Sequence, residues 1–86
     1  MPEVARFYGI IIQFFYNDHA PPHFHAVYGE FDAQVNIDDF SIIKGKLPKR
    51  AHELVILWAS QHKDDLLREW ELSRNEQPLF KIDPLT

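Results

Sequence analysis

Residues Asn17–Gly29 read N-D-H-A-P-P-H-F-H-A-V-Y-G, and this stretch decides how the rest of the chain is interpreted. Its first half contains Asn, Asp and two adjacent prolines, which are turn-forming residues and predict a loop. The segment His23–Tyr28 has the residue types of a short strand. Gly29 with Glu30 then predicts a tight turn in which the glycine adopts positive φ. The stretch therefore predicts a loop, a strand and a turn in succession.

Three further segments predict strands on either side of this stretch. Phe7–Tyr16 is apolar on both alternating faces, which predicts one central strand that is covered on both sides. Phe31–Ile37 alternates strictly between apolar and polar residues, as a half-buried strand does. The pair Asp38–Asp39 predicts a turn into a short strand, Phe40–Lys44. Because all the connections are short, the four strands predict an antiparallel meander.

The C-terminal half predicts helices. Pro48 suits a first helical turn, and residues 51–62 repeat their apolar positions with the helical period. This helix is apolar on most of its sides, so we expect it to lie deep or to be covered by a partner, including a second copy of the chain. A second helix is predicted over Asp64–Asn75, and one helix kinked near His62 is an alternative because neither Gly nor Pro separates the two.

The predicted elements combine into one α+β domain over residues 1–86. An antiparallel sheet of about four strands should carry two C-terminal helices packed on one face. The segment Leu79–Ile82 predicts a last strand.

Composition limits the classes of protein to which the chain can belong. It is 45% hydrophobic, 14% aromatic and 26% charged, which is typical of a globular domain. The absence of cysteine excludes disulfides, thiolate zinc sites and cysteine nucleophiles. We find neither a signal-peptide pattern nor an apolar run of about 18 residues, so we expect a cytoplasmic protein that does not use a membrane. The net charge of −4 argues against a non-specific DNA-binding protein.

The histidines of the opening stretch are the strongest candidates for chemistry. His23 and His25 are two residues apart on a strand and should share a face, and His19 precedes them beside Asp18. Imidazole and carboxylate groups bind divalent transition metals, so a candidate metal site consists of Asp18, His19, His23 and His25. Imidazole also transfers protons near neutral pH, so the candidate catalytic residues of a metal-free site are His19, His23 and His25. A third interpretation is structural: the histidines form surface hydrogen bonds while the core face consists of Phe24, Ala26 and Tyr28.

A basic stretch precedes the predicted helix. Four cations lie within seven residues at the N-terminal end of this helix: Lys44, Lys46, Lys49 and Arg50. Cations oppose the dipole at a helix N-terminus, and a bound phosphate or an acidic partner would offset that repulsion. These residues are therefore candidates for binding anions or RNA. The alternative is a solvated basic loop that nearby acidic residues neutralise.

Several motifs together resemble a family of small bacterial proteins named only as a domain of unknown function, DUF4160. They are R-F-Y-G-I-I-I, the opening stretch, G-K-L-P-K-R, and a helix that ends in L-x-x-W-E-L. The resemblance runs from Pro2 to Ile82. It implies a free-standing protein that belongs to a gene pair of the toxin–antitoxin type, beside another small protein. It implies no catalytic residues, because the family has no settled activity.

Three functional hypotheses follow. The leading one is a cytoplasmic toxin–antitoxin-like component that binds a small partner protein and binds or cleaves RNA through the histidine loop and the basic stretch. It requires these two regions to meet in space. The second is a metal-binding protein with a divalent transition metal as cofactor. The third is a non-enzymatic interaction module that binds a partner protein or forms a homo-oligomer through helix 51–62.

Overall fold

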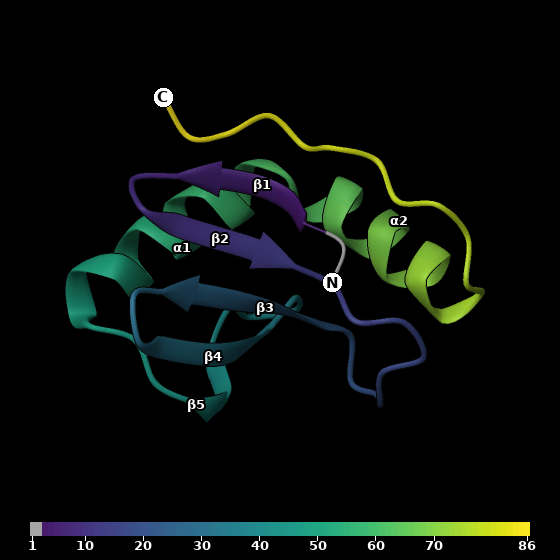
Figure 1. Cartoon of the computed structure of the whole chain (residues 1–86), viewed down its shortest axis with the longest axis horizontal. Helices are drawn as coiled ribbons and strands as arrows, with labels where there is room; N and C mark the ends of the chain where they lie inside the picture. Colours follow the sequence, from purple (N-terminus) through teal and green to yellow (C-terminus); the bar gives the residue numbers. More distant parts are fainter. Residues whose placement is uncertain (1–2) are drawn as a thin grey trace.

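The computed structural model describes residues 3–86 and shows a five-stranded sheet followed by two helices (Figure 1). The strands are β1 (Glu3–Phe7), β2 (Ile10–Gln13), β3 (His23–Tyr28), β4 (Phe31–Asn36) and β5 (Ile42–Gly45). The helices are α1 (Lys49–Gln61) and α2 (Lys63–Arg74). The strands lie in chain order, and every neighbouring pair is antiparallel. The predicted α+β meander is confirmed.

The prediction of one long strand over Phe7–Tyr16 is wrong. The chain reverses at Tyr8 and Gly9, with φ values of 49° and 80°, and Phe7 pairs with Ile10. Two consecutive residues at positive φ form the two-residue turn whose twist matches a β-hairpin. The apolar alternation continues through this turn, and a bulky Tyr rarely occupies its first position, so periodicity did not reveal it. The sheet therefore has five strands rather than about four.

The prediction of two C-terminal helices is confirmed, whereas the prediction of a last strand is not. The helical part is interrupted at His62, which has φ −131° and ψ 26°, so the structure contains two helices rather than one kinked helix. The predicted strand Leu79–Ile82 is wrong, because the segment is extended but belongs to no sheet. One backbone hydrogen bond fastens it to β1, from the Ile82 N–H to the Val4 carbonyl at 2.8 Å. This one backbone bond to β1 forms no ladder, and the tail is held in addition by side-chain bonds, from the Phe80 N–H to Glu69 and from the Trp58 indole to the Asp83 carbonyl.

The turn at Gly29 and the alternation of the next strand are confirmed. Gly29 has φ 59°, and Ala33 and Val35 of β4 are buried while Asp32 points outward. Period-two alternation thus places one face of the sheet against the core.

The core lies between the sheet and the two helices, which cover the same face (Figure 1). Trp58 of α1 is fully buried, with its ring 5.2 Å from that of Phe7 and 6.0 Å from that of Phe24. Only one side of α1 is covered in this way, because Ile56 and Leu57 are 37% and 52% exposed. Within residues 3–86, neither helix has the length and hydropathy needed to cross a membrane.

Candidate metal centre

Strand β3 and the loop before it place three polar side chains together. His23 and His25 alternate with Phe24 and Ala26, which are fully buried in the core. The two histidines therefore occupy the opposite face of the strand, as their spacing predicts. They are 3% and 6% exposed, and their ring centroids are 5.3 Å apart. Such burial requires partners for their ring nitrogens.

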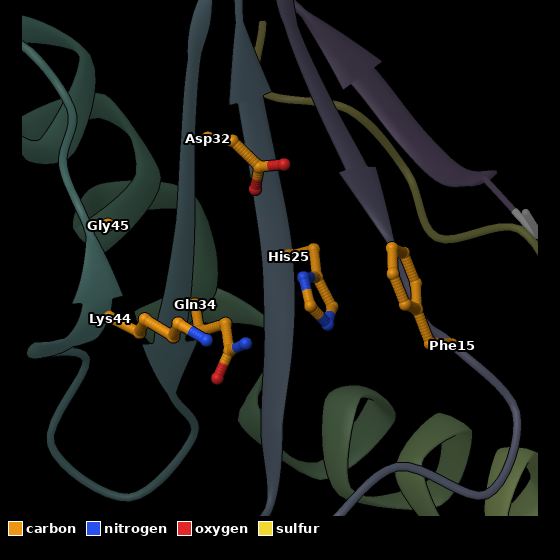
Figure 2. Close-up of a pocket in the computed structure, with 6 residues that line it drawn as sticks. All are labelled: Phe15, His25, Asp32, Gln34, Lys44 and Gly45. Carbon is orange, nitrogen blue, oxygen red and sulfur yellow. The ribbon is translucent and has the colours of Figure 1, made fainter.

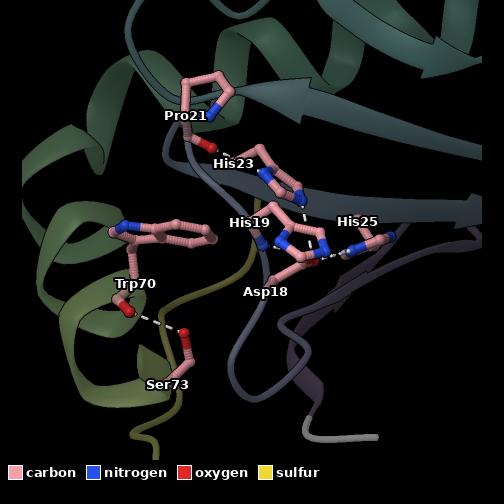
Figure 3. A network of polar contacts seen from close by, with 7 residues as sticks. All are labelled: Asp18, His19, Pro21, His23, His25, Trp70 and Ser73. Carbon is pink, nitrogen blue, oxygen red and sulfur yellow. Dashed lines mark hydrogen bonds and ion pairs between the residues drawn. The ribbon is translucent and has the colours of Figure 1, made fainter. Parts of the chain in front are cut away.

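Asp18 is the shared partner of both histidines. The Nε2 atoms of His23 and His25 each lie 2.9 Å from Oδ2 of Asp18 (Figure 3). The second carboxylate oxygen accepts the backbone N–H of His19 at 2.9 Å. One atom from each of the three side chains lies within 4.8 Å of the others. The site is thus two imidazoles and one carboxylate that point at a common centre.

Each imidazole ring is fixed by contacts on its other side. The Nδ1–H of His23 donates to the carbonyl of Pro21 at 2.8 Å, and its ring lies 5.1 Å from that of Trp70 in α2. The ring of His25 stacks on Phe15, with 3.9 Å between centroids and 9° between planes. The two rings are therefore held with Nε2 toward Asp18 before any ligand binds.

Helix α2 anchors the loop that carries Asp18. The backbone N–H of Asn17 donates to the carbonyl of Ser73 at 3.2 Å, and its side-chain amide donates to Glu76 at 2.9 Å. The N–H of Ile37 donates to the carbonyl of Pro22 at 3.0 Å at the other end of the loop. The sequence analysis assigned α2 no part in the site, and no local sequence signal marks these long-range contacts.

Opposing effects act on the pKa of Asp18. Burial raises it and is the largest single effect, but the hydrogen bond from His25, the backbone N–H of His19 and the electrostatic and hydrogen-bond effects of His23 together hold the pKa below its ordinary value. Asp18 is therefore a carboxylate near neutral pH.

The hydrogen bond to Pro21 creates a conflict at the other nitrogen of His23. A carbonyl only accepts, so Nδ1 carries the hydrogen, and Nε2 of a neutral ring then presents a lone pair to the Asp18 carboxylate at 2.9 Å. Two lone pairs at this distance repel unless a proton or a metal cation lies between them. Metal–ligand distances of about 2.0–2.1 Å put neighbouring ligands roughly 2.9 Å apart in an octahedral site and roughly 3.3–3.4 Å apart in a tetrahedral zinc site. Shifts of a few tenths of an ångström would accommodate either geometry. The three side chains therefore fit a metal ion.

The structure separates His19 from this centre. Its side chain is exposed, and its ring takes part in none of the hydrogen bonds found among residues 3–86. Of the four residues of the predicted metal site, Asp18, His23 and His25 have ligand atoms within 4.8 Å of one another, and His19 is not part of this group. His19 is next to Asp18 in sequence, but its contact with the carboxylate is through its backbone N–H.

A hollow of about 300 Å³ lies beside His25 on the sheet (Figure 2). Its lining residues come from β3, β4, β5 and the segment that follows β2: Phe15, His25, Asp32, Gln34, Lys44 and Gly45. Pairing across the sheet brings them there, because His25 is opposite Gln34 and Gln34 is opposite Lys44. Nothing in the sequence marked Phe15, Asp32 and Gln34 as site residues, and they were not predicted.

The basic stretch meets the histidines through one residue only. Lys44 lines the hollow together with His25. Lys46, Lys49 and Arg50 are exposed and are not among the residues that line it. The proximity that the RNA hypothesis requires is thus met at this hollow by Lys44 alone among the four cations.

Comparison with known proteins assigns a family and nothing more specific. No curated protein and no solved structure matches the chain. The family described as Domain of unknown function (DUF4160) matches residues 9–71, a range that spans the loop, both histidines of the site and α1. Because this match covers most of the chain, the protein belongs to the DUF4160 family.

Proposed function

We propose that the protein binds one divalent transition metal ion through Asp18, His23 and His25. The observation that carries the proposal is the pair of Nε2 atoms that face one carboxylate oxygen, while Nδ1 of His23 is already bonded to Pro21. Metal ligation turns the facing lone pairs from a repulsion into bonds. Two imidazoles and one carboxylate form a ligand set used for iron(II) and for zinc.

The contacts that surround the three ligand side chains support the same proposal. Metal-binding histidines usually donate their other ring nitrogen to a carbonyl or carboxylate, and His23 does so to Pro21. Phe15 and Trp70 provide an apolar wall beside the two rings. Asp18 is the most accessible ligand, with 18% of its side chain exposed, so solvent reaches the centre past its carboxylate. Three protein ligands leave coordination positions for water or substrate, which is the arrangement of hydrolytic metal centres.

Direct proton transfer to RNA fits the geometry less well. A catalytic base must come within hydrogen-bonding reach of the ribose hydroxyl. Only 4% of the His23 side chain is exposed, and only 8% of that of His25. Their Nε2 atoms face Asp18 rather than the surface.

A second candidate function retains the RNA hypothesis. In it, the chain is a cytoplasmic toxin–antitoxin-like component that pairs with a small partner protein and acts on RNA at the metal centre. The position of Lys44 beside His25 in one hollow favours it, because an ammonium group there attracts phosphate. Overexpression should then arrest growth, and Lys44→Gln should relieve the arrest while Lys46→Gln does not. Absence of arrest by the wild-type chain, or equal relief by both variants, would contradict this candidate.

The metal proposal is tested with tag-free protein, since a polyhistidine tag binds the same ions. Elemental analysis should find one transition metal ion per chain, or calorimetry should show that metal-free protein takes up one Zn²⁺, Ni²⁺ or Fe²⁺. His25→Gln should lose this binding, and His19→Gln should keep it because the His19 ring lies outside the centre. Circular dichroism establishes that both variants fold. A wild-type chain that takes up none of these ions would overturn the proposal.

A further inference from the structure

The hollow beside His25 contains three polar groups that have no partner within residues 3–86. Two are donors, the amide of Gln34 and the ammonium of Lys44; the third group is Nδ1 of His25, which becomes a donor when Nε2 binds a metal instead of donating to Asp18. None of the three forms a side-chain hydrogen bond or ion pair in that part of the chain. Lateral pairing places these three residues in one row across β3, β4 and β5. Neighbouring strands are about 4.8 Å apart, so the row spans roughly 10 Å.

The orientation of His25 directs one of these groups into the hollow. Its Nε2 is bonded to Asp18, and its ring is stacked on Phe15. Figure 2 shows the other ring nitrogen on the side of Gln34 and Lys44. No side-chain nitrogen or oxygen of the described residues is both fully buried and unpaired, so Nδ1 reaches the open space. When Nε2 binds a metal, the neutral ring carries its hydrogen on Nδ1 and becomes a donor there.

We propose that this hollow is an anion site that holds a phosphate group between the Lys44 ammonium, the Gln34 amide and the Nδ1–H of His25. Charged and neutral N–H donors that converge on one space are the chemistry of phosphate recognition. Asp32 lines the hollow as well, and its carboxylate repels an anion, so the phosphate must bind at the end of the hollow where Lys44 lies. The hollow of about 300 Å³ has room for a phosphate group together with part of the molecule that carries it.

The anion site and the metal centre share His25, so each should strengthen the other. A phosphate that accepts the Nδ1–H makes the imidazole a stronger metal ligand, and second-shell partners of this kind change metal affinity by about 10–100-fold. This coupling rests on the proposed metal function, whereas anion binding by Lys44 and Gln34 does not. By linkage, metal must raise anion affinity by the same factor.

Two titrations test the site and its coupling separately. In the first, inorganic phosphate is added to metal-free protein at constant ionic strength, and amide and side-chain NMR resonances are followed. We expect saturable shifts at Gln34 and Lys44. Lys44→Gln should weaken the binding about tenfold, because a hydrogen bond to a charged group contributes roughly 1.5–3 kcal/mol. The control Lys46→Gln, in an exposed cation outside the hollow, should bind as the wild type does.

The second titration measures Zn²⁺ affinity with and without sulfate, a tetrahedral anion that does not precipitate zinc. Sulfate at a concentration that just saturates the wild type should tighten its zinc binding about tenfold, and Lys44→Gln should need about ten times more sulfate for the same effect. Shifts that do not saturate, or that saturate at the same phosphate concentration in Lys44→Gln as in the wild type, overturn the anion site even if zinc binds. Failure of zinc to bind overturns the metal centre and the coupling, and the phosphate titration still decides the anion site.

Discussion

Nε2 of His23 and Oδ2 of Asp18 lie 2.9 Å apart, although the opposite nitrogen of the same ring already donates to the Pro21 carbonyl. In the metal-free protein with neutral His23, this contact joins two groups that both present lone pairs. A cation between them replaces this repulsion with two attractive interactions. Under the proposed metal function, this contact governs both the stability of the metal-free protein and the affinity for the metal.

Asp18→Asn separates these two effects. An Asn amide presents two hydrogens where Oδ2 now lies, so it can donate to Nε2 of His23 and of His25. Removing one lone-pair repulsion should make the metal-free variant at least as stable as the wild type, with a gain of up to about 1 kcal/mol or a Tm rise of about 4–8 °C. Metal should then no longer raise the Tm. The wild type should gain about 2.7 kcal/mol at a metal concentration 100 times the Kd.

Thermal unfolding of both proteins with chelator and with Zn²⁺ checks this prediction. If Asp18 instead forms an ordinary buried ion pair with a protonated His23, the Asn variant loses about 3–5 kcal/mol. A large Tm drop in chelator would therefore contradict the account.

Phe15→Leu should weaken metal binding with little effect on folding. Phe15 is partly exposed, and its stack on His25 at 3.9 Å holds the ring that carries one ligand atom. Loss of such support should reduce Zn²⁺ affinity about tenfold. Calorimetry measures this, and Tyr16→Leu is the control because Tyr16 is the exposed next residue. Equal loss of affinity in the two variants would show that the stack has no particular role.

Gly45→Ala should displace β5 from the sheet. Gly45 has φ 82°, and a Cβ there would lie 2.1 Å from the backbone oxygen of Asp32, which cannot move without breaking the pairing. Strain of this kind costs of the order of 1–3 kcal/mol. Gly29→Ala has a similar positive φ with open space around it, so it should cost only about 1 kcal/mol. Urea unfolding compares the two, and equal destabilisation would argue against the close approach.

Glu69→Gln should loosen the C-terminal tail. Glu69 is fully buried in α2 and accepts the backbone N–H of Phe80 at 2.6 Å and the Nε–H of Arg68 at 3.2 Å. Loss of the charged acceptor should destabilise the protein by about 1.5–3 kcal/mol. Limited proteolysis should then cut the tail faster than in the exposed control Glu71→Gln. An unchanged cleavage rate would mean that other contacts hold the tail.

Much of the fold follows from local patterns. The strict alternation of Phe31–Ile37 and the turn at Gly29 depend on a few adjacent residues, and both are as predicted. The hairpin at Tyr8 and Gly9 could not be predicted from such a pattern. Apolar alternation looks the same in one strand as in two strands joined by a two-residue turn. The tail at Ile82 resembles a strand in sequence but makes a single backbone bond to β1.

Part of the site could likewise be predicted from the sequence, and part could not. The spacing of His23 and His25 places them on one face, since side chains two apart on a strand point the same way. Sequence proximity could not separate Asp18 from His19, because the path of the loop depends on bonds to α2 that are distant in sequence. Lys44 lies near His25 because of the register in which the strands pair. A meander predicts that these strands are neighbours, but a bulge in β5 shifts the register, so the sequence did not predict which residues face each other.

The most direct test of the metal centre identifies the ligand atoms. Long-range ¹H–¹⁵N spectra of the histidine rings, recorded before and after one equivalent of Zn²⁺, report each imidazole nitrogen separately. We predict that Nε2 of His23 and of His25 shift on zinc binding, while the rings of His19, His52 and His62 keep their resonances. Unchanged spectra for His23 and His25, or zinc-dependent shifts confined to the other three rings, would contradict the account.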